Sequence, residues 1–103
     1  MKKLPPVHPG EVLLEDFMKP HGLSAYRVAK DIGVPALRVH QIIKGARGIS
    51  ADTALRLARY FGTSAAVWVR MQARYELEIA QAELERRIDK EVKVLSSRRA
   101  EAA

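Results

Sequence analysis

The feature that most constrains this chain is a group of residues spaced as two closely crossing helices require. Ala29 is small enough for a second helix to cross near it, and Gly33, four residues later, suits a turn with left-handed backbone. Apolar residues occupy the offsets that lock such a pair together: Val28, Ile32, Val34, Val39 and Ile42. Seven positions agree with one geometry. The sequence therefore predicts a helix-turn-helix over roughly residues 25–44.

Three further helices are expected around this pair. A first helix over residues 9–18 has apolar side chains at helical spacing, and residues 19–22 end it with a proline and a glycine. A fourth helix begins after the N-cap Ser50 and ends at Gly62. A fifth follows a cap at Thr63 or Ser64 and contains Trp68. No alternating strand pattern is present, so the predicted fold class is all-α.

Positive charge is concentrated in the middle of the chain. Residues 19–74 contain ten basic and two acidic side chains, a net charge of +8, while the flanks sum to −2. A basic centre between such flanks favours a surface that binds a polyanion, although an ordinary solvated face explains the charge alone equally well. Together with the helix-turn-helix, the charge predicts binding to double-stranded DNA, and it argues against an interaction module that does not bind DNA.

The second helix of the motif is expected to read bases. With Val39 and Ile42 facing inward, its N-terminal residues would meet base edges in the major groove. Gln41 suits adenine, whereas Arg38 suits either the O6 and N7 atoms of guanine or a phosphate. Short apolar side chains suit a thymine methyl group. The predicted base-reading residues are Ala36, Leu37, Arg38 and Gln41.

Phosphate contacts are expected on both sides of that helix. Free N–H groups and the helix dipole favour an anion at the start of the first helix of the motif, and the loop after the second helix is basic. Ser50 is explained by capping alone, and capping is compatible with a phosphate contact. The predicted phosphate-binding residues are Ser24, Tyr26, Arg27, His40, Lys44, Arg47 and Ser50.

The fifth helical pattern runs on in an apolar stripe of Leu84, Ile88, Val92 and Leu95. We expect this stripe to meet a twin helix, to fold back on its own domain or to dock a partner protein. A homodimer is preferred, because one module buries too little surface for tight specific binding. A twofold dimer would read half-sites about 34–36 Å apart or a multiple of that. Residues 1–78 are therefore predicted as the DNA-binding domain, and residues 79–103 as a helical extension with a polar tail.

The composition of the chain also argues against other classes of protein. The absence of cysteine excludes disulfides, thiolate zinc sites and cysteine nucleophiles, and fits a reducing cytoplasm. No apolar run approaches the about 18 residues of a membrane span, and the basic start lacks the apolar stretch of a signal peptide. His8, His21 and His40 lack the spacing of a helical metal pair, and no glycine-rich phosphate loop is present. We expect a cytoplasmic protein that is not an enzyme and needs no metal or cofactor.

Four stretches resemble the HigA-type (VapI-like) antitoxins of bacterial toxin–antitoxin modules, within the lambda-repressor-like (XRE-type) helix-turn-helix proteins. They are HPGEVLLEDFM at 8–18, LSAYRVAKDIGVPALRVHQIIKGARGIS at 23–50, ADTALRLARYFGTS at 51–64 and VWVRMQARYELE at 67–78. The opening His-Pro-Gly-Glu and the last stretch separate this branch from generic repressors. The match fades after Glu78.

The resemblance implies five helices, a homodimer and repression of its own operon. It also implies a partner, a small basic RelE-like toxin that cuts mRNA and that the antitoxin neutralises by binding. The alternative is a free-standing transcriptional regulator without a toxin partner. The recognition positions of the family fall here on Ala36, Leu37, Arg38, His40, Gln41 and Lys44.

Overall fold

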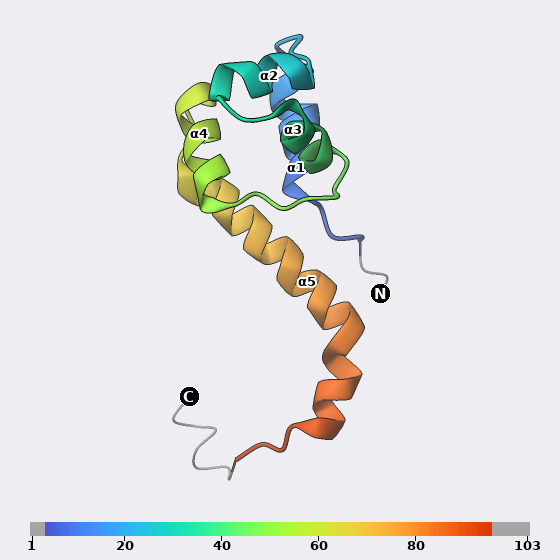
Figure 1. Ribbon diagram of the computed structural model, residues 1–103. Coiled ribbons are helices and arrows are strands. Elements are labelled where there is room, and N and C mark those ends of the chain that lie inside the picture. The colour runs from blue at the N-terminus through green and yellow to red at the C-terminus, as the bar shows by residue number, and fades with distance from the viewer. Residues whose placement is uncertain (1–3, 96–103) are drawn as a thin grey trace.

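The chain folds into helices joined by short loops, as seen in a computed structural model that describes residues 4–95 (Figure 1). The elements are α1 (Pro9–Val12), η1 (Leu13–Met18), α2 (Ala25–Ile32), α3 (Ala36–Ile43), α4 (Ala51–Phe61) and α5 (Ala65–Glu91). Because η1 continues α1 without a break, residues 4–95 form five helical segments and no strand, as predicted. None of the helices in this range combines the length and apolar character of a membrane span.

Side-chain caps fix the helix starts where the sequence predicted them. The hydroxyls of Ser24 and Ser50 each accept the backbone N–H of the residue three positions later in the chain. These hydrogen bonds mark the starts of α2 and α4. Of the two candidates for α5, Ser64 is the cap. Thr63 instead accepts the indole N–H of Trp68 at 2.8 Å. Capping rules thus place the helices, and a tertiary contact decides between neighbouring hydroxyls.

The first helix is wider than the regular α-helix that its spacing predicts. Residues 13–18 form a π-helix, and the N–H of Lys19 bonds to the carbonyl of Leu14, five residues earlier, at 2.9 Å. The wider turn brings Leu13 and Met18, also five residues apart, into the core with 1% of each exposed. An i, i+3, i+4 pattern does not anticipate this arrangement.

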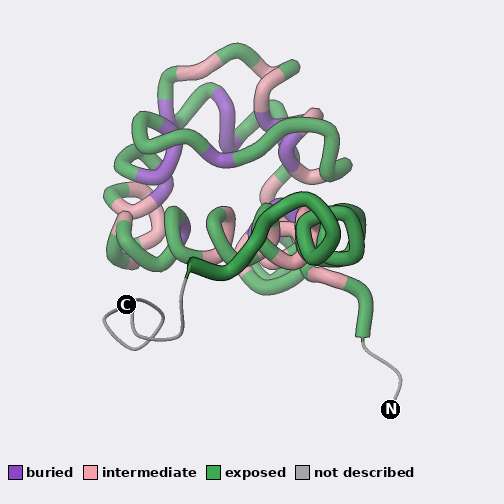
Figure 2. Tube along the Cα trace, turned by 90° about the horizontal axis from the view of Figure 1, so that it is seen from below, coloured by how far each residue is buried: buried purple, intermediate pink, exposed green. Residues whose placement is uncertain are grey.

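The core lies between the first four helical segments and the start of α5. Trp68 is fully buried and its ring lies 5.3 Å from that of Phe17. The residues predicted to lock the helix-turn-helix are in the same core, with Val34 at its margin. Figure 2 shows the buried segments inside the body and none on the far part of α5.

The far half of α5 extends from the body, which gives the molecule extents of 54 × 28 × 24 Å (Figure 1). Residues 81–95 are exposed throughout, so the helix does not fold back on its own domain. The helix also ends earlier than its pattern predicts. Val92 has extended backbone, and Val92 and Leu95 therefore lie beyond the helix that carries Leu84 and Ile88. The expected polar tail from residue 96 lies outside the described residues.

Candidate nucleic-acid interface

The crossing of α2 and α3 has the geometry that the sequence predicted. Gly33 ends α2 in left-handed backbone with φ of 77°, and its N–H bonds to the carbonyl of Ala29 at 2.9 Å. Ala29 is 1% exposed and Val28 is fully buried beneath the crossing. The turn therefore fixes the direction of α3 relative to the core.

The outer face of α3 is open to solvent. Leu37 is 64% exposed, and His40 and Lys44 are exposed as well. Ala36 lies at the edge of this face, half-buried and in contact with the core. The inner face is closed by Val39, which is 1% exposed. The helix thus separates a packed side from a side that is free to meet a partner.

Arg38 does not project freely from this face. Its Nη1 lies 3.4 Å from a carboxylate oxygen of Asp52 at the start of α4, and its side chain is 30% exposed. Asp52 also accepts from Nε of Arg56 at 3.0 Å. Arg56 in turn donates to the carbonyl of Ile32 at 2.8 Å, which holds α4 against the turn after α2. Arg38 is therefore one end of a chain of ion pairs and hydrogen bonds.

The loop between α3 and α4 is held from three directions. Arg47 donates through Nε to the side-chain oxygen of Gln41 at 2.9 Å, which joins a predicted phosphate contact to a predicted base contact. Gln72 of α5 accepts the N–H of Ile49 at 2.9 Å. The ring of His8 lies next to Gly45 at the start of the loop.

His8 links this loop to the start of α1. Its Nδ1 accepts the N–H of Gly10 at 2.9 Å, and its ring meets the edge of Tyr75 at 4.8 Å. Burial lowers the pKa of His8, and the hydrogen bond to the Arg47 backbone offsets part of that effect. A side chain at Gly10 would overlap the carbonyl of Ile42 at the end of α3. The segment 8–10 therefore packs directly against the last turn of α3.

On the α2 side, Tyr26 is 68% exposed, and Arg27 forms an exposed ion pair with Asp31 at 2.7 Å. The Tyr60 hydroxyl also donates to Asp31. This hydrogen bond and the Arg27 guanidinium lower the pKa of Asp31. Of the candidate phosphate contacts on α2, Arg27 is thus held by a neighbouring carboxylate.

Sequence reasoning missed four residues that position the site: Asp52, Arg56, Tyr60 and Gln72. Asp52 and Arg56 carry a local signal, since opposite charges four residues apart pair on a helix. Their contacts to Arg38 and Ile32 span 14 and 24 residues, and the sequence contains no signal for these. The far part of α5, which carries the candidates Leu84 and Ile88, extends away from this site (Figure 1), and the candidates Val92 and Leu95 follow the end of that helix.

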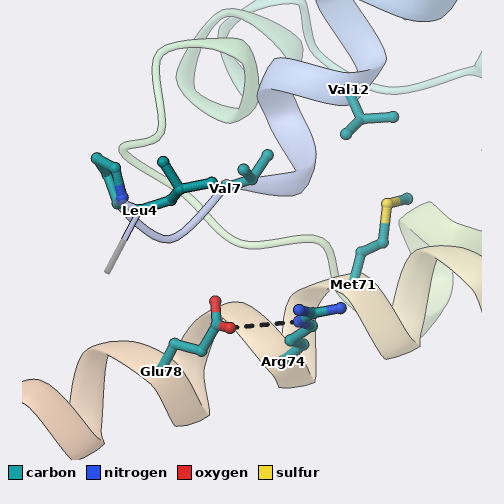
Figure 3. Close-up of a pocket in the computed structure, with 7 residues that line it drawn as sticks. Leu4, Val7, Val12, Met71, Arg74 and Glu78 are labelled. Carbon is teal, nitrogen blue, oxygen red and sulfur yellow. Dashed lines mark hydrogen bonds and ion pairs between the residues drawn. The ribbon is translucent and has the colours of Figure 1, made fainter. Parts of the chain in front are cut away.

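A groove of about 360 Å³ lies elsewhere, between the N-terminal segment, α1 and α5. Leu4, Val7, Val12 and Met71 line it with apolar side chains (Figure 3). Its charged groups, Arg74 and Glu78, pair with each other at 3.3 Å. Its lining is therefore mainly apolar and unlike the basic face around α3.

Comparison with known proteins gives consistent matches. Residues 14–68 match the family described as Helix-turn-helix. Virulence-associated protein I of Dichelobacter nodosus is 49% identical over 79 residues, 77% of this chain and 73% of that protein. An uncharacterized HTH-type transcriptional regulator of Escherichia coli K12, YbaQ, is 31% identical over 72 residues, 70% of this chain and 64% of that protein.

A solved structure agrees over a longer stretch. The structure titled Pseudomonas aeruginosa antitoxin HigA with higBA promoter has a TM-score of 0.85 at 41% identity, over 87% of this chain and 98% of that one. The agreement includes much of α5 as well as the helix-turn-helix. The chain belongs to the helix-turn-helix family, in the branch that contains the HigA-type (VapI-like) antitoxins.

Proposed function

We propose that this chain binds double-stranded operator DNA through the outer face of α3 and represses its own operon. The observation that carries the proposal is the position of α3, fixed by a buried crossing with α2 while Leu37, His40 and Lys44 remain exposed. The net charge of +8 over residues 19–74 supports it. The related HigA, whose structure was solved with the higBA promoter, supports it further.

The residues of the site have two roles: some contact base edges, and others bind phosphates. Ala36, Leu37, Arg38 and Gln41 contact base edges, with Gln41 placed by its hydrogen bond from Arg47. Phosphates are held by Ser24, Tyr26, Arg27, His40, Lys44, Arg47 and Ser50. The two serines act through the helix starts that they cap, where free N–H groups face the anion.

The protein acts as a homodimer, joined through the far part of α5. Leu84 and Ile88 are 38% and 47% exposed on a part of α5 that no other segment of residues 4–95 covers, which supports pairing with a second copy. Val92 and Leu95, just beyond the helix, complete the apolar surface. In this proposal residues 1–78 form the DNA-binding domain, and residues 79–103 form the extension.

The chain is an antitoxin that binds and neutralises a small basic RelE-like toxin that cuts mRNA. The relative described as an antitoxin supports this role. The second candidate is a free-standing regulator, which the YbaQ description favours. Co-purification with the product of the adjacent gene separates the two. A stable complex that abolishes mRNA cleavage supports the antitoxin role, and a neighbour that neither binds nor cleaves RNA contradicts it.

The test of DNA reading starts from a randomised duplex library, from which the wild-type protein should enrich one site. Arg38→Ala and Gln41→Ala should each cost about 1–3 kcal/mol on that site and relax the preference at one position. Arg47→Ala should weaken all duplexes about equally and flatten the salt dependence by roughly one unit. Arg74→Ala, another exposed and ion-paired arginine, is the matched control and should leave the preference unchanged.

Two results would contradict the proposal. The first is a wild-type protein that enriches no sequence and does not bind duplex DNA at low salt. The second is a base preference that neither Arg38→Ala nor Gln41→Ala alters, since base reading would then lie outside the outer face of α3.

A further inference from the structure

The two acidic residues within the basic centre both contact arginines of the proposed interface. Asp31 pairs with Arg27, assigned to phosphate, at 2.7 Å. Asp52 pairs with Arg38, assigned to a base, at 3.4 Å. An acidic side chain beside DNA weakens binding, because the phosphates repel its negative charge. Since the two acids hold arginines with different assigned roles, they are expected to have different effects on binding.

Asp52 is held firmly in its place. The carboxylate accepts from Arg56 at 3.0 Å, and Arg56 is itself bonded to the carbonyl of Ile32 at 2.8 Å. The Asp52 side chain is nevertheless 57% exposed. A fixed and open carboxylate therefore remains beside the start of α3 when Arg38 moves away from it.

Arg38 is drawn back toward α4 by this contact. Its Nε is buried and has no hydrogen-bond partner, and its Nη1 contacts Asp52. Reaching a base edge requires Arg38 to leave Asp52. Its departure exposes the carboxylate to the phosphates of the DNA. A base with two matched acceptors draws Arg38 out, so the operator complex carries this cost. On a mismatched duplex Arg38 stays paired with Asp52, and the cost is not incurred.

We infer that Asp52 is a specificity-determining residue that limits the preference for the operator: only a matching base draws Arg38 away from Asp52, so Asp52 weakens binding to the operator more than binding to non-matching DNA. The inference rests on the proposed function of the α3 face. Asp52 does not touch a base in this account and acts through Arg38.

The experiment measures affinity for two duplexes at one salt concentration: the site enriched by the wild-type protein and a scrambled duplex of the same composition. Asp52→Asn keeps the shape of the side chain and removes its charge. It should tighten binding to the enriched site more than to the scrambled duplex, so that the ratio of the two affinities, enriched over scrambled, rises about two- to fivefold, the range for an exposed ion pair.

Asp31→Asn is the matched control, since it removes the same charge beside an arginine assigned to phosphate. It should strengthen binding to both duplexes alike and leave their ratio unchanged. In an Arg38→Ala background, Asp52→Asn should no longer alter the ratio. Asp52→Glu, which keeps the charge, should leave the ratio close to that of the wild type. Thermal melting of each variant checks that it folds.

Each outcome decides the inference. A ratio that is unchanged or falls in Asp52→Asn, an equal rise in Asp31→Asn, or a rise that persists without Arg38 overturns the inference, while the proposed function stands. A wild-type protein that does not distinguish the two duplexes overturns the proposed function itself. A rise specific to Asp52 and dependent on Arg38 supports the inference.

Discussion

The two halves of α5 differ although they belong to one unbroken helix. The first half carries the fully buried Trp68, and Gln72 and Tyr75 contact the loop after α3 and the segment before α1. In the second half, residues 81–91 are all exposed, including Leu84 and Ile88. Apolar residues at helical spacing therefore serve folding in one half and remain uncovered in the other. Periodicity alone does not distinguish a core from an interface.

The difference assigns separate roles to the two halves. Burial of a large apolar side chain stabilises a fold by about 1.5–3 kcal/mol, and this gain falls on the first half. The second half gains only local support, such as the exposed pair of Arg87 and Glu91 at 3.1 Å. We expect substitutions in the first half to affect unfolding, and those in the second half to affect assembly.

The largest expected effect is that of Trp68→Ala. Removing a fully buried indole should lower the free energy of unfolding by about 3–5 kcal/mol, through lost burial and the cavity that remains. Urea denaturation measures the change. Ile88→Ala, at a protein concentration where the chain is monomeric, should change the free energy of unfolding by less than about 0.5 kcal/mol. Equal losses from both substitutions would remove the distinction between the two halves.

A charge on the exposed stripe should act on assembly. Ile88→Glu places a carboxylate in the proposed dimer contact and should convert a dimer into a monomer in sedimentation. It should also weaken operator binding about 100-fold, because two linked half-site contacts become one. Ala82→Glu adds the same charge at an exposed position off the stripe and should leave the dimer intact. A dimer that survives Ile88→Glu would show that the contact lies elsewhere.

The smallest expected effect is a pH dependence of the free energy of unfolding, caused by His8, which joins the first half of α5 to α1. Because folding lowers its pKa below 6.5, the unfolded chain binds the proton more readily. The contribution of His8 to stability is therefore complete above pH 6.5 and is lost as the pH falls through the lowered pKa.

His8→Asn is the control for this pH dependence, since asparagine also caps a helix but does not titrate. Urea denaturation between pH 7 and pH 5 should show a steeper loss of stability in the wild type than in His8→Asn. Parallel curves would mean that protonation of His8 is not coupled to folding.

Local chemistry made the helices predictable. Ser24, Gly33 and Ser50 follow capping rules that depend on neighbours in sequence, so α2, α3 and α4 begin and end close to the expected places. The pairing of Arg38 with Asp52 depends on how α4 packs beside α3, and no short pattern encodes that distance. The outer face of α3 was therefore predictable, whereas the restraint on Arg38 was not.

The end of α5 also could not be predicted from the sequence pattern alone. Val92 and Leu95 continue the helical spacing, yet the helix ends at Glu91. Val92 and Val94 are β-branched and favour extended backbone, and the described chain gives this segment no packing that would offset that preference. Spacing predicts which face a residue would occupy in a helix, but packing decides where an exposed helix ends.

The most direct test of the central claim is chemical protection of guanine N7, which lies in the major groove, on the enriched duplex. The account predicts that the wild-type protein protects a guanine N7 within each half-site and that Arg38→Ala or Gln41→Ala alters the protection there. Bound duplex whose guanine N7 atoms all stay reactive, with protection confined to adenine N3 in the minor groove, would contradict major-groove reading by α3.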